Sequence, residues 1–259
     1  MFYDIEEDEI MLKFVIDKKA QIEIHRASSR GYFDYGWLKT SHSFSFARYF
    51  EPDKIHFGAL RVLNDDVIEA GKGFGSHPHD NMEIITIPIE GELKHEDSMG
   101  SSQIIRTNEV QVMSAGTGIF HSEENSSFEN DVKLFQIWIF PKERNIVPIY
   151  HQAYFNPDDA KNEWQLLVGE KDSDAELTIN QNATVKRSFL DKGNTLTIIT
   201  ESHSFGNYLF VVDGKISIED IILGKRDAVG IENNGIINIT ALENSYLLNI
   251  EIPDAPSLF

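Results

Sequence analysis

Short strand-like runs separated by turn residues recur along almost the whole chain, and they constrain its fold more than any other feature. In the first half, Gly, Asp, Asn or Pro separate runs at 57–63, 82–89, 109–113 and 132–140. Such runs at this spacing are typical of all-β barrels and sandwiches. Long stretches with apolar residues at helical spacing are missing. The sequence therefore predicts an all-β protein.

A stretch rich in proline, near the middle of the chain, marks the predicted domain boundary. Prolines at positions 141, 148 and 157 interrupt the strand pattern, which then resumes to the C-terminus. Each half is long enough for one small β-domain. The predicted organisation is an N-terminal extension with a first strand over 1–22, a first domain over 23–150 and a second domain over 151–259.

Two local signals predict particular turns. Asn156 followed by Pro157 predicts the start of a short helix over 156–164, with Asn156 as its N-cap. Asp213-Gly214, directly after a strand-like run, predicts a β-hairpin turn.

Composition excludes several kinds of site and partner. The 259 residues are 41% hydrophobic and contain 17 Phe, which is enough to bury a core, and they contain no Cys. Disulfides, iron–sulfur clusters and thiol catalysis are therefore excluded. The net charge of −19 argues against direct binding of DNA or RNA. No apolar run could span a bilayer, and the acidic N-terminus, before a second possible start at Met11, does not resemble a signal peptide. A soluble, cytoplasmic protein is predicted.

Two short histidine motifs carry the chemistry that the sequence suggests. They are His77-Pro78-His79 and His121-Ser122-Glu123. Residues i and i+2 of a strand point to the same face, so each pair would project together. Two such strands that face one another would supply three imidazoles and one carboxylate. That set suits a redox-active divalent metal such as iron, with coordination positions left open.

The spacing around these motifs resembles the two cupin motifs. The first is Gly71-x5-His77-x-His79-x3-Glu83-x7-Gly91, and the second is Gly116-x4-His121-x3-Asn125. The wider strings 77–83, 94–100 and 113–123, together with 43–47 and 57–64, resemble the pirin family, and in particular its bacterial quercetinase-like branch. The resemblance is strong over about residues 23–155 and loose beyond them.

This resemblance implies a bicupin: two antiparallel β-barrels of the double-stranded β-helix or jelly-roll type, packed face to face. It implies one divalent metal in the first barrel and none in the second. Fe(II) is the expected ion, and Cu, Ni, Mn, Co and Zn are the alternatives. Carried over by position, the ligands are His77, His79, His121 and Glu123.

The identity of the carboxylate ligand is open at this point. In many cupins it is the Glu of the first motif, here Glu83, whereas in pirins it is the Glu of His-x-Glu, here Glu123. The i, i+2 relation to His121 favours Glu123, although the even offset between His79 and Glu83 does not exclude the other. His95 is expected either to line the pocket or donate a hydrogen bond to a ligand, or only to end a strand before a turn over 97–100.

The function implied by the resemblance is that of a metal-dependent dioxygenase, which opens the ring of quercetin or a related flavonol with O₂. Glu123 would then take the proton of the flavonol 3-hydroxyl as general base. The alternative is a non-enzymatic, metal-dependent or redox-sensing regulator that binds a protein partner. An apolar pocket open to the metal would favour the enzyme.

Overall fold

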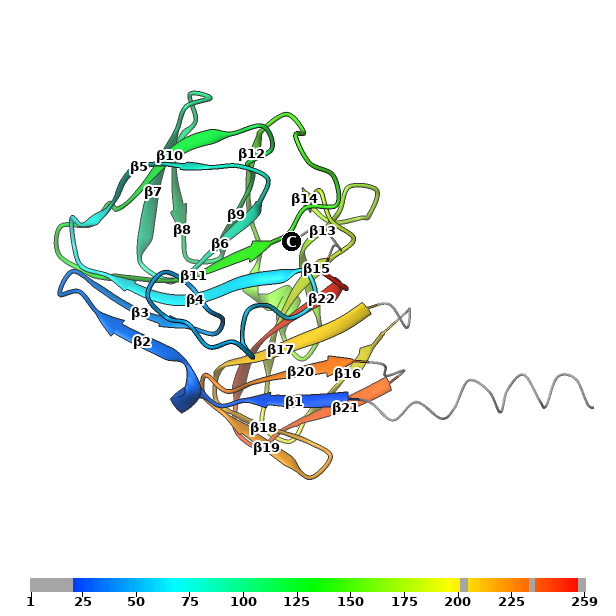
Figure 1. The fold of residues 1–259 in the computed structure, drawn as a ribbon. Helices are drawn as coiled ribbons and strands as arrows, with labels where there is room; N and C mark the ends of the chain where they lie inside the picture. Colours follow the sequence, from blue (N-terminus) through cyan, green and yellow to red (C-terminus); the bar gives the residue numbers. More distant parts are fainter. Residues whose placement is uncertain (1–20, 201–204, 233–235, 256–259) are drawn as a thin grey trace, which may run out of the picture.

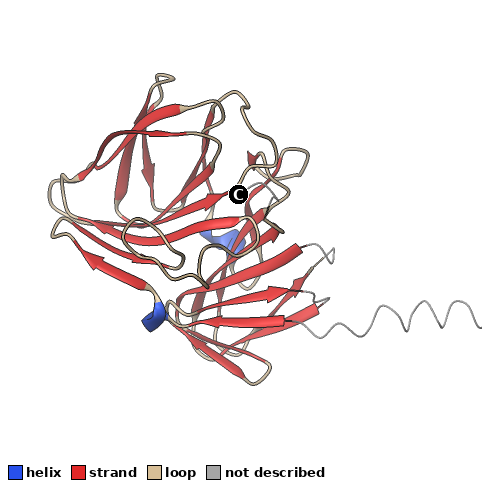
Figure 2. Cartoon of the chain, in the orientation of Figure 1, coloured by secondary structure: helices blue, strands red, loops and turns tan. Residues whose placement is uncertain are grey.

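The computed structural model describes residues 21–200, 205–232 and 236–255 of the chain (Figures 1 and 2). Regular structure in these ranges consists of strands and two single 3₁₀ turns, η1 Ala27–Ser29 and η2 Pro157–Ala160. The predicted all-β class is therefore confirmed. Neither of these turns has the length or apolar character that crossing a bilayer requires. Most of the predicted N-terminal extension, including Met11, lies outside the described residues.

The first half contains a seven-stranded and a four-stranded sheet. The larger sheet has the order β12-β9-β6-β11-β4-β3-β2. Its strands are β2 Gly31–Asp34, β3 Leu38–His42, β4 Leu60–Ile68, β6 Glu83–Glu90, β9 Glu109–Ser114, β11 Val132–Ile139 and β12 Ile149–Tyr154. The smaller sheet, in the order β5-β10-β7-β8, contains β5 Gly73–His79, β7 Glu92–Asp97, β8 Ser102–Arg106 and β10 Ile119–Asn125.

The second half repeats this arrangement. Its seven-stranded sheet has the order β1-β20-β17-β22-β15-β13-β14. The strands are β1 Gln21–His25, β13 Gln165–Glu170, β14 Leu177–Ile179, β15 Thr184–Leu190, β17 Phe205–Asp213, β20 Ala228–Glu232 and β22 Ser245–Pro253. The four-stranded sheet, in the order β16-β21-β18-β19, contains β16 Thr195–Ile199, β18 Lys215–Ile218, β19 Ile221–Gly224 and β21 Ile236–Ala241. The predicted pair of cupin-type units is thus confirmed. Among the described strands of each unit, no strand of one sheet pairs with a strand of the other sheet. Neither barrel is therefore closed.

One hydrophobic core joins the two seven-stranded sheets and therefore the two halves of the chain. Phe135 of β11 packs edge-to-face against Phe210 of β17, with 5.3 Å between the ring centroids. Leu134 and Gln136 flank Phe135 and point to the opposite face, since successive side chains of a strand alternate. The large sheet of the first half is therefore buried on both faces. One face belongs to the shared core, and the other faces the small sheet of its own unit.

An ion pair at the edge of this core also connects the halves. Arg226, in the turn before β20, places its Nε 2.8 Å from Oδ2 of Asp65 in β4. The same guanidinium donates a hydrogen bond to the carbonyl of Val212 and lies 5.0 Å from the ring centroid of Phe135. Arg30 lies 3.3 Å from the same carboxylate oxygen. Asp65 thus binds two arginines, one of them from the second half.

Two strands pair across the predicted domain boundaries. β1 pairs along its whole length with β20, so residues 21–25 complete a sheet of the second half. β12 pairs with β9, so residues 149–154 belong to a sheet of the first half. The domain boundaries at 22/23 and 150/151 stay predictions. The pairing of β1 and β12 with strands of the other predicted domain crosses them.

The prediction of a short helix at Asn156 was right in its N-cap and wrong in its extent, and the prediction of a β-hairpin at Asp213-Gly214 was wrong. The Asn156 side chain caps η2 by accepting a hydrogen bond from the backbone N–H of Asp158 at 3.2 Å, but the turn ends at Ala160. Asn162 then adopts a left-handed conformation and its N–H bonds to Phe189 of β15, which stops helix growth. The Asp213-Gly214 turn does not close a hairpin, because β17 and β18 belong to different sheets.

Substitution of Arg226 by Ala should lower the free energy of unfolding by about 2–4 kcal/mol. The change leaves the partly buried Asp65 carboxylate with one fewer cation and removes a cation–π contact. Denaturant unfolding at neutral pH measures the loss. Lys225→Ala is the matched control, because its pair with Asp213 is exposed and should contribute less than about 0.5 kcal/mol. Equal losses in the two variants would contradict this account.

Candidate metal centre

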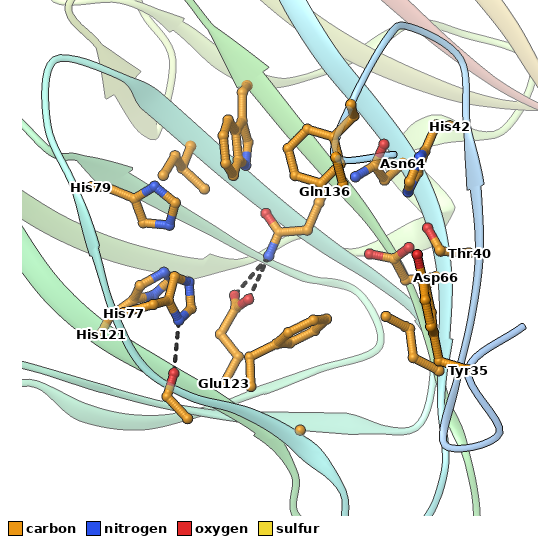
Figure 3. A pocket seen from close by; sticks show the side chains of 18 of the residues that line it. Tyr35, Thr40, His42, Asn64, Asp66, His77, His79, His121, Glu123 and Gln136 are labelled. Carbon is orange, nitrogen blue, oxygen red and sulfur yellow. Dashed lines mark hydrogen bonds between the residues drawn. The ribbon is translucent and has the colours of Figure 1, made fainter. Parts of the chain in front are cut away.

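Three imidazoles meet at one end of a cavity between the two sheets of the first half (Figure 3). His77 and His79 lie on β5, and His121 lies opposite His77 on the neighbouring strand β10. One ring nitrogen from each lies within 4.8 Å of those of the other two. The ring centroids of His77 and His121 are 4.4 Å apart. Gly73 allows the close approach of these strands, because a Cβ there would collide with the backbone carbonyl of Glu123.

Hydrogen bonds on the far side of the His77 and His121 rings fix which nitrogen of each faces the cavity. His77 Nδ1 lies 2.8 Å from the carbonyl oxygen of Gly75, which can only accept, so this nitrogen carries the proton. His95 Nε2 lies 3.2 Å from Asp97 Oδ2, and His95 Nδ1 lies 3.4 Å from His121 Nδ1. With Asp97 as acceptor at one end, His121 Nδ1 is the donor to His95. The lone pairs of His77 Nε2 and His121 Nε2 are then free to bind a cation.

His121 is the most constrained of the three imidazoles. It is 2% exposed, and its Nε2 is buried without a hydrogen-bond partner. Burial, together with the neighbouring histidines 77, 79 and 95, lowers the pKa of His121 to about 2. The same causes, burial first and then His77, lower the pKa of His79 to about 4. Both rings are therefore neutral at physiological pH, which is the form that binds metals.

Glu123 lies next to the imidazoles on the same face of β10 as His121. Gln136 Nε2 donates to both of its carboxylate oxygens, at 2.7 and 2.8 Å, and the Thr86 hydroxyl lies 3.4 Å from Oε1. A carboxylate oxygen of Glu123 lies within 4.8 Å of ring nitrogens of His121 and His95. Burial raises the pKa of Glu123 to about 7, against the opposing effect of the Gln136 hydrogen bond.

Glu83 lies apart from this group. It shares a face of β6 with Ile85 and Ile87, which belong to the core between the halves. Its Oε2 accepts hydrogen bonds from the Ser114 hydroxyl at 2.5 Å and from the backbone N–H of Asn180, in the second half, at 3.1 Å. A turn over 80–82 separates Glu83 from His79, so the alternation of side chains along one strand does not relate these two residues. Of the two candidate carboxylates, the structure brings only Glu123 to the imidazoles.

His95 lies behind His121 and does not line the cavity. Its side chain is fully buried, stacks on Tyr150 with 4.7 Å between the ring centroids, and bonds to Asp97. Burial lowers the pKa of His95. His95 therefore lies behind His121, where it accepts a hydrogen bond from His121 Nδ1 and does not donate one to a possible ligand.

The cavity beside the imidazoles has a volume of about 540 Å³ and largely aromatic walls. The walls include Tyr35, Trp37, Phe46, Phe74 and Trp138. The Trp138 ring packs edge-on against His79, with 4.8 Å between the ring centroids. A planar aromatic molecule would fit a cavity of this size and lining.

Sequence reasoning missed the polar floor of this cavity. Asn64 and Asp66 on β4, His42 and Thr40 on β3, and Gln136 on β11 all line it, opposite or beside Glu123 (Figure 3). Burial raises the pKa of Asp66 to about 7. The available signal was the run Asn64-Asp65-Asp66 inside an otherwise apolar strand, since at least one of these residues had to point inward.

Two family models match most of the chain. The model described as Pirin matches residues 23–139, and the model described as Quercetinase C-terminal cupin domain matches residues 166–252. The first match contains all four of the predicted ligands.

Curated proteins and solved structures agree with these matches. The chain is 40% identical to a quercetin 2,3-dioxygenase of Escherichia coli K12 over 90% of this chain and 99% of that protein. It is 39% identical to a pirin-like protein of Caulobacter vibrioides over 84% and 94%. The crystal structure of the E. coli bacterial pirin YhhW in complex with nickel(II) superposes with a TM-score of 0.85, at 38% identity, and covers 91% of this chain and 100% of that one.

The buried carboxyl of Asp66 should make the stability of the metal-free protein depend on pH. Its pKa is about 7 in the folded chain and about 4 in the unfolded chain. The stability that the protonated carboxyl contributes is therefore fully present below pH 4 and is lost as the pH rises to 7. The stability of Asp66→Asn relative to wild type should therefore rise by about 2 kcal/mol as the pH increases from 5 to 8. Urea unfolding with a chelator present measures this difference. The exposed Asp53→Asn control should follow the wild-type profile at every pH.

Proposed function

The chain belongs to the pirin family, and on this premise we propose that it is a metal-dependent dioxygenase that opens the ring of quercetin or a related flavonol with O₂. The observation that carries the proposal is the aromatic cavity that ends at three converging imidazoles. A relative at 40% identity is named for this activity.

The donor set fits a divalent metal. The Nε2 of His121 is buried and unpartnered and suits a cation better than a proton, and the Nδ1–H bond of His77 to Gly75 turns His77 Nε2 toward the same place. His77, His79, His121 and Glu123 would hold it. When bound, the metal would supply Lewis acidity that lowers the pKa of a substrate hydroxyl, and redox activity toward O₂. A relative is named as a nickel(II) complex, and Fe(II) remains the predicted ion, with Cu, Ni, Mn, Co or Zn as alternatives.

Glu123 would accept the proton of the substrate hydroxyl. Its pKa of about 7 matches the requirement of a general base near neutral pH. The Gln136 amide donates to both carboxylate oxygens and so fixes the orientation of Glu123 toward the cavity. The aromatic walls would hold the planar substrate and exclude water from the reacting end.

The alternative function is a metal-dependent or redox-sensing regulator that binds a protein partner, and the same ligands would serve it. The cavity favours the enzyme, because a regulator needs no space for a small aromatic molecule beside its metal. The predicted cytoplasmic location stays a prediction.

Replacing His121 by Ala should lower metal content or affinity at least about tenfold, because one of four donors is lost. The fold should persist, because the shared core does not include His121. Metal analysis after dialysis, with circular dichroism as the check on folding, measures both effects. His151→Ala, an exposed histidine on β12, should keep the wild-type metal content. Equal metal content in the two variants would contradict the assignment.

The activity itself is tested by oxygen uptake after anaerobic loading with Fe(II). Addition of quercetin should start O₂ consumption with release of carbon monoxide. Glu123→Gln should lower kcat by a factor of about 10²–10⁴, the usual contribution of a general base, whereas exposed Glu124→Gln should not. Bound iron without O₂ uptake would refute the dioxygenase and leave the metal site standing.

A further inference from the structure

We propose that His42, Asn64 and Asp66 form a second recognition site in the cavity, which binds phenolic hydroxyl groups at the end of the substrate away from the imidazoles. This inference rests on the proposed function, because it concerns how the same aromatic substrate is held.

The three side chains form one continuous wall. His42 of β3 and Asn64 of β4 are cross-strand partners, and Asp66 follows Asn64 on the same face of β4. Figure 3 shows this wall across the cavity from His77, His79 and His121, with Glu123 and Gln136 between the two groups. The cavity therefore has two polar ends joined by aromatic walls.

Each side chain of this wall presents a buried atom without a hydrogen-bond partner. The atoms are His42 Nδ1, Asn64 Oδ1 and Asp66 Oδ1, and their residues are only 3%, 5% and 4% exposed. Buried polar atoms in folded proteins nearly always have a partner. The Thr40 hydroxyl, the cross-strand neighbour of Asp66, is a fourth unpartnered atom on this wall, and a ligand would supply hydrogen bonds that these atoms lack.

The chemistry of the wall selects hydrogen-bond donors. Asn64 Oδ1 can only accept a hydrogen bond from a ligand, and the Asp66 carboxyl keeps an acceptor oxygen in either protonation state. A hydroxyl group on an aromatic ring donates one hydrogen bond and leaves the ring to pack on the walls, here Tyr35 and Phe46.

The span of the cavity suits this arrangement. Facing sheets lie roughly 10 Å apart, and a fused two-ring aromatic molecule can cross that gap. One end of it would lie at the imidazoles of the small sheet, and its ring hydroxyls would lie at Asn64 and Asp66 of the large sheet.

The test compares two ligands on protein loaded with redox-inert zinc, under argon. Quercetin carries hydroxyl groups on its outer rings, whereas 3-hydroxyflavone has only the group that would face the metal. Wild type should bind quercetin at least about tenfold more tightly, the effect of one hydrogen bond to a buried partner. Asn64→Leu and Asp66→Leu should each remove most of this preference and leave 3-hydroxyflavone affinity within about twofold. Asp66→Asn, which keeps a hydrogen-bond acceptor, should retain the preference for quercetin.

The outcomes separate this proposal from the proposed function. Exposed Asp53→Asn is the matched control, and zinc content is measured for every variant. If both Leu variants keep the quercetin preference, or weaken both ligands equally, the second site is refuted while flavonol binding at the metal stands. If wild type binds neither ligand, the flavonol function and the second site both fail. If the preference disappears in the variants but the iron enzyme consumes no O₂, the second site stands and the dioxygenase does not. Asn64→Leu carries the test if Asp66→Leu does not fold.

Discussion

Side chains of the large sheet in the first half alternate between two buried faces, and this alternation fixes both the contact between the halves and the cavity. In β11, Phe135 and Ile137 enter the core shared with the second half, while Gln136 and Trp138 between and beside them line the cavity. A shift of one residue in register would exchange these sets and place polar groups in the shared core. The contact between the halves and the cavity are therefore fixed by the same pattern.

β4 shows the electrostatic consequence of this alternation. Asp65 faces the second half, where it binds Arg226 and Arg30, and Asp66 faces the cavity, where burial raises its pKa to about 7. Two adjacent acids thus have opposite roles. One is compensated by cations and stabilises the fold, whereas the other is left for a ligand and costs stability until one binds.

Polar groups cross the large sheet of the first half as one continuous row, part of which lines the cavity. Gln111, Thr86, Gln136, Asn64 and His42 are successive cross-strand neighbours on β9, β6, β11, β4 and β3, and all are buried. Such a row is expensive in a sheet, because each unsatisfied buried group costs about 1–3 kcal/mol. Glu123 is held above it by Gln136 and Thr86. The row connects the candidate metal centre to the opposite wall, so the two ends of the cavity share one scaffold.

Local patterns were enough to predict the all-β class and the pairs His77–His79 and His121–Glu123, because strand periodicity acts over a few residues. The family came from the resemblance of longer strings. The folded chain was needed to show that Glu83 faces the second half, that β1 completes the other unit's sheet, and that Asp66 rather than Asp65 lines the cavity. Alternation tells which residues share a face but not what covers that face, since the covering sheet comes from residues far away in the chain.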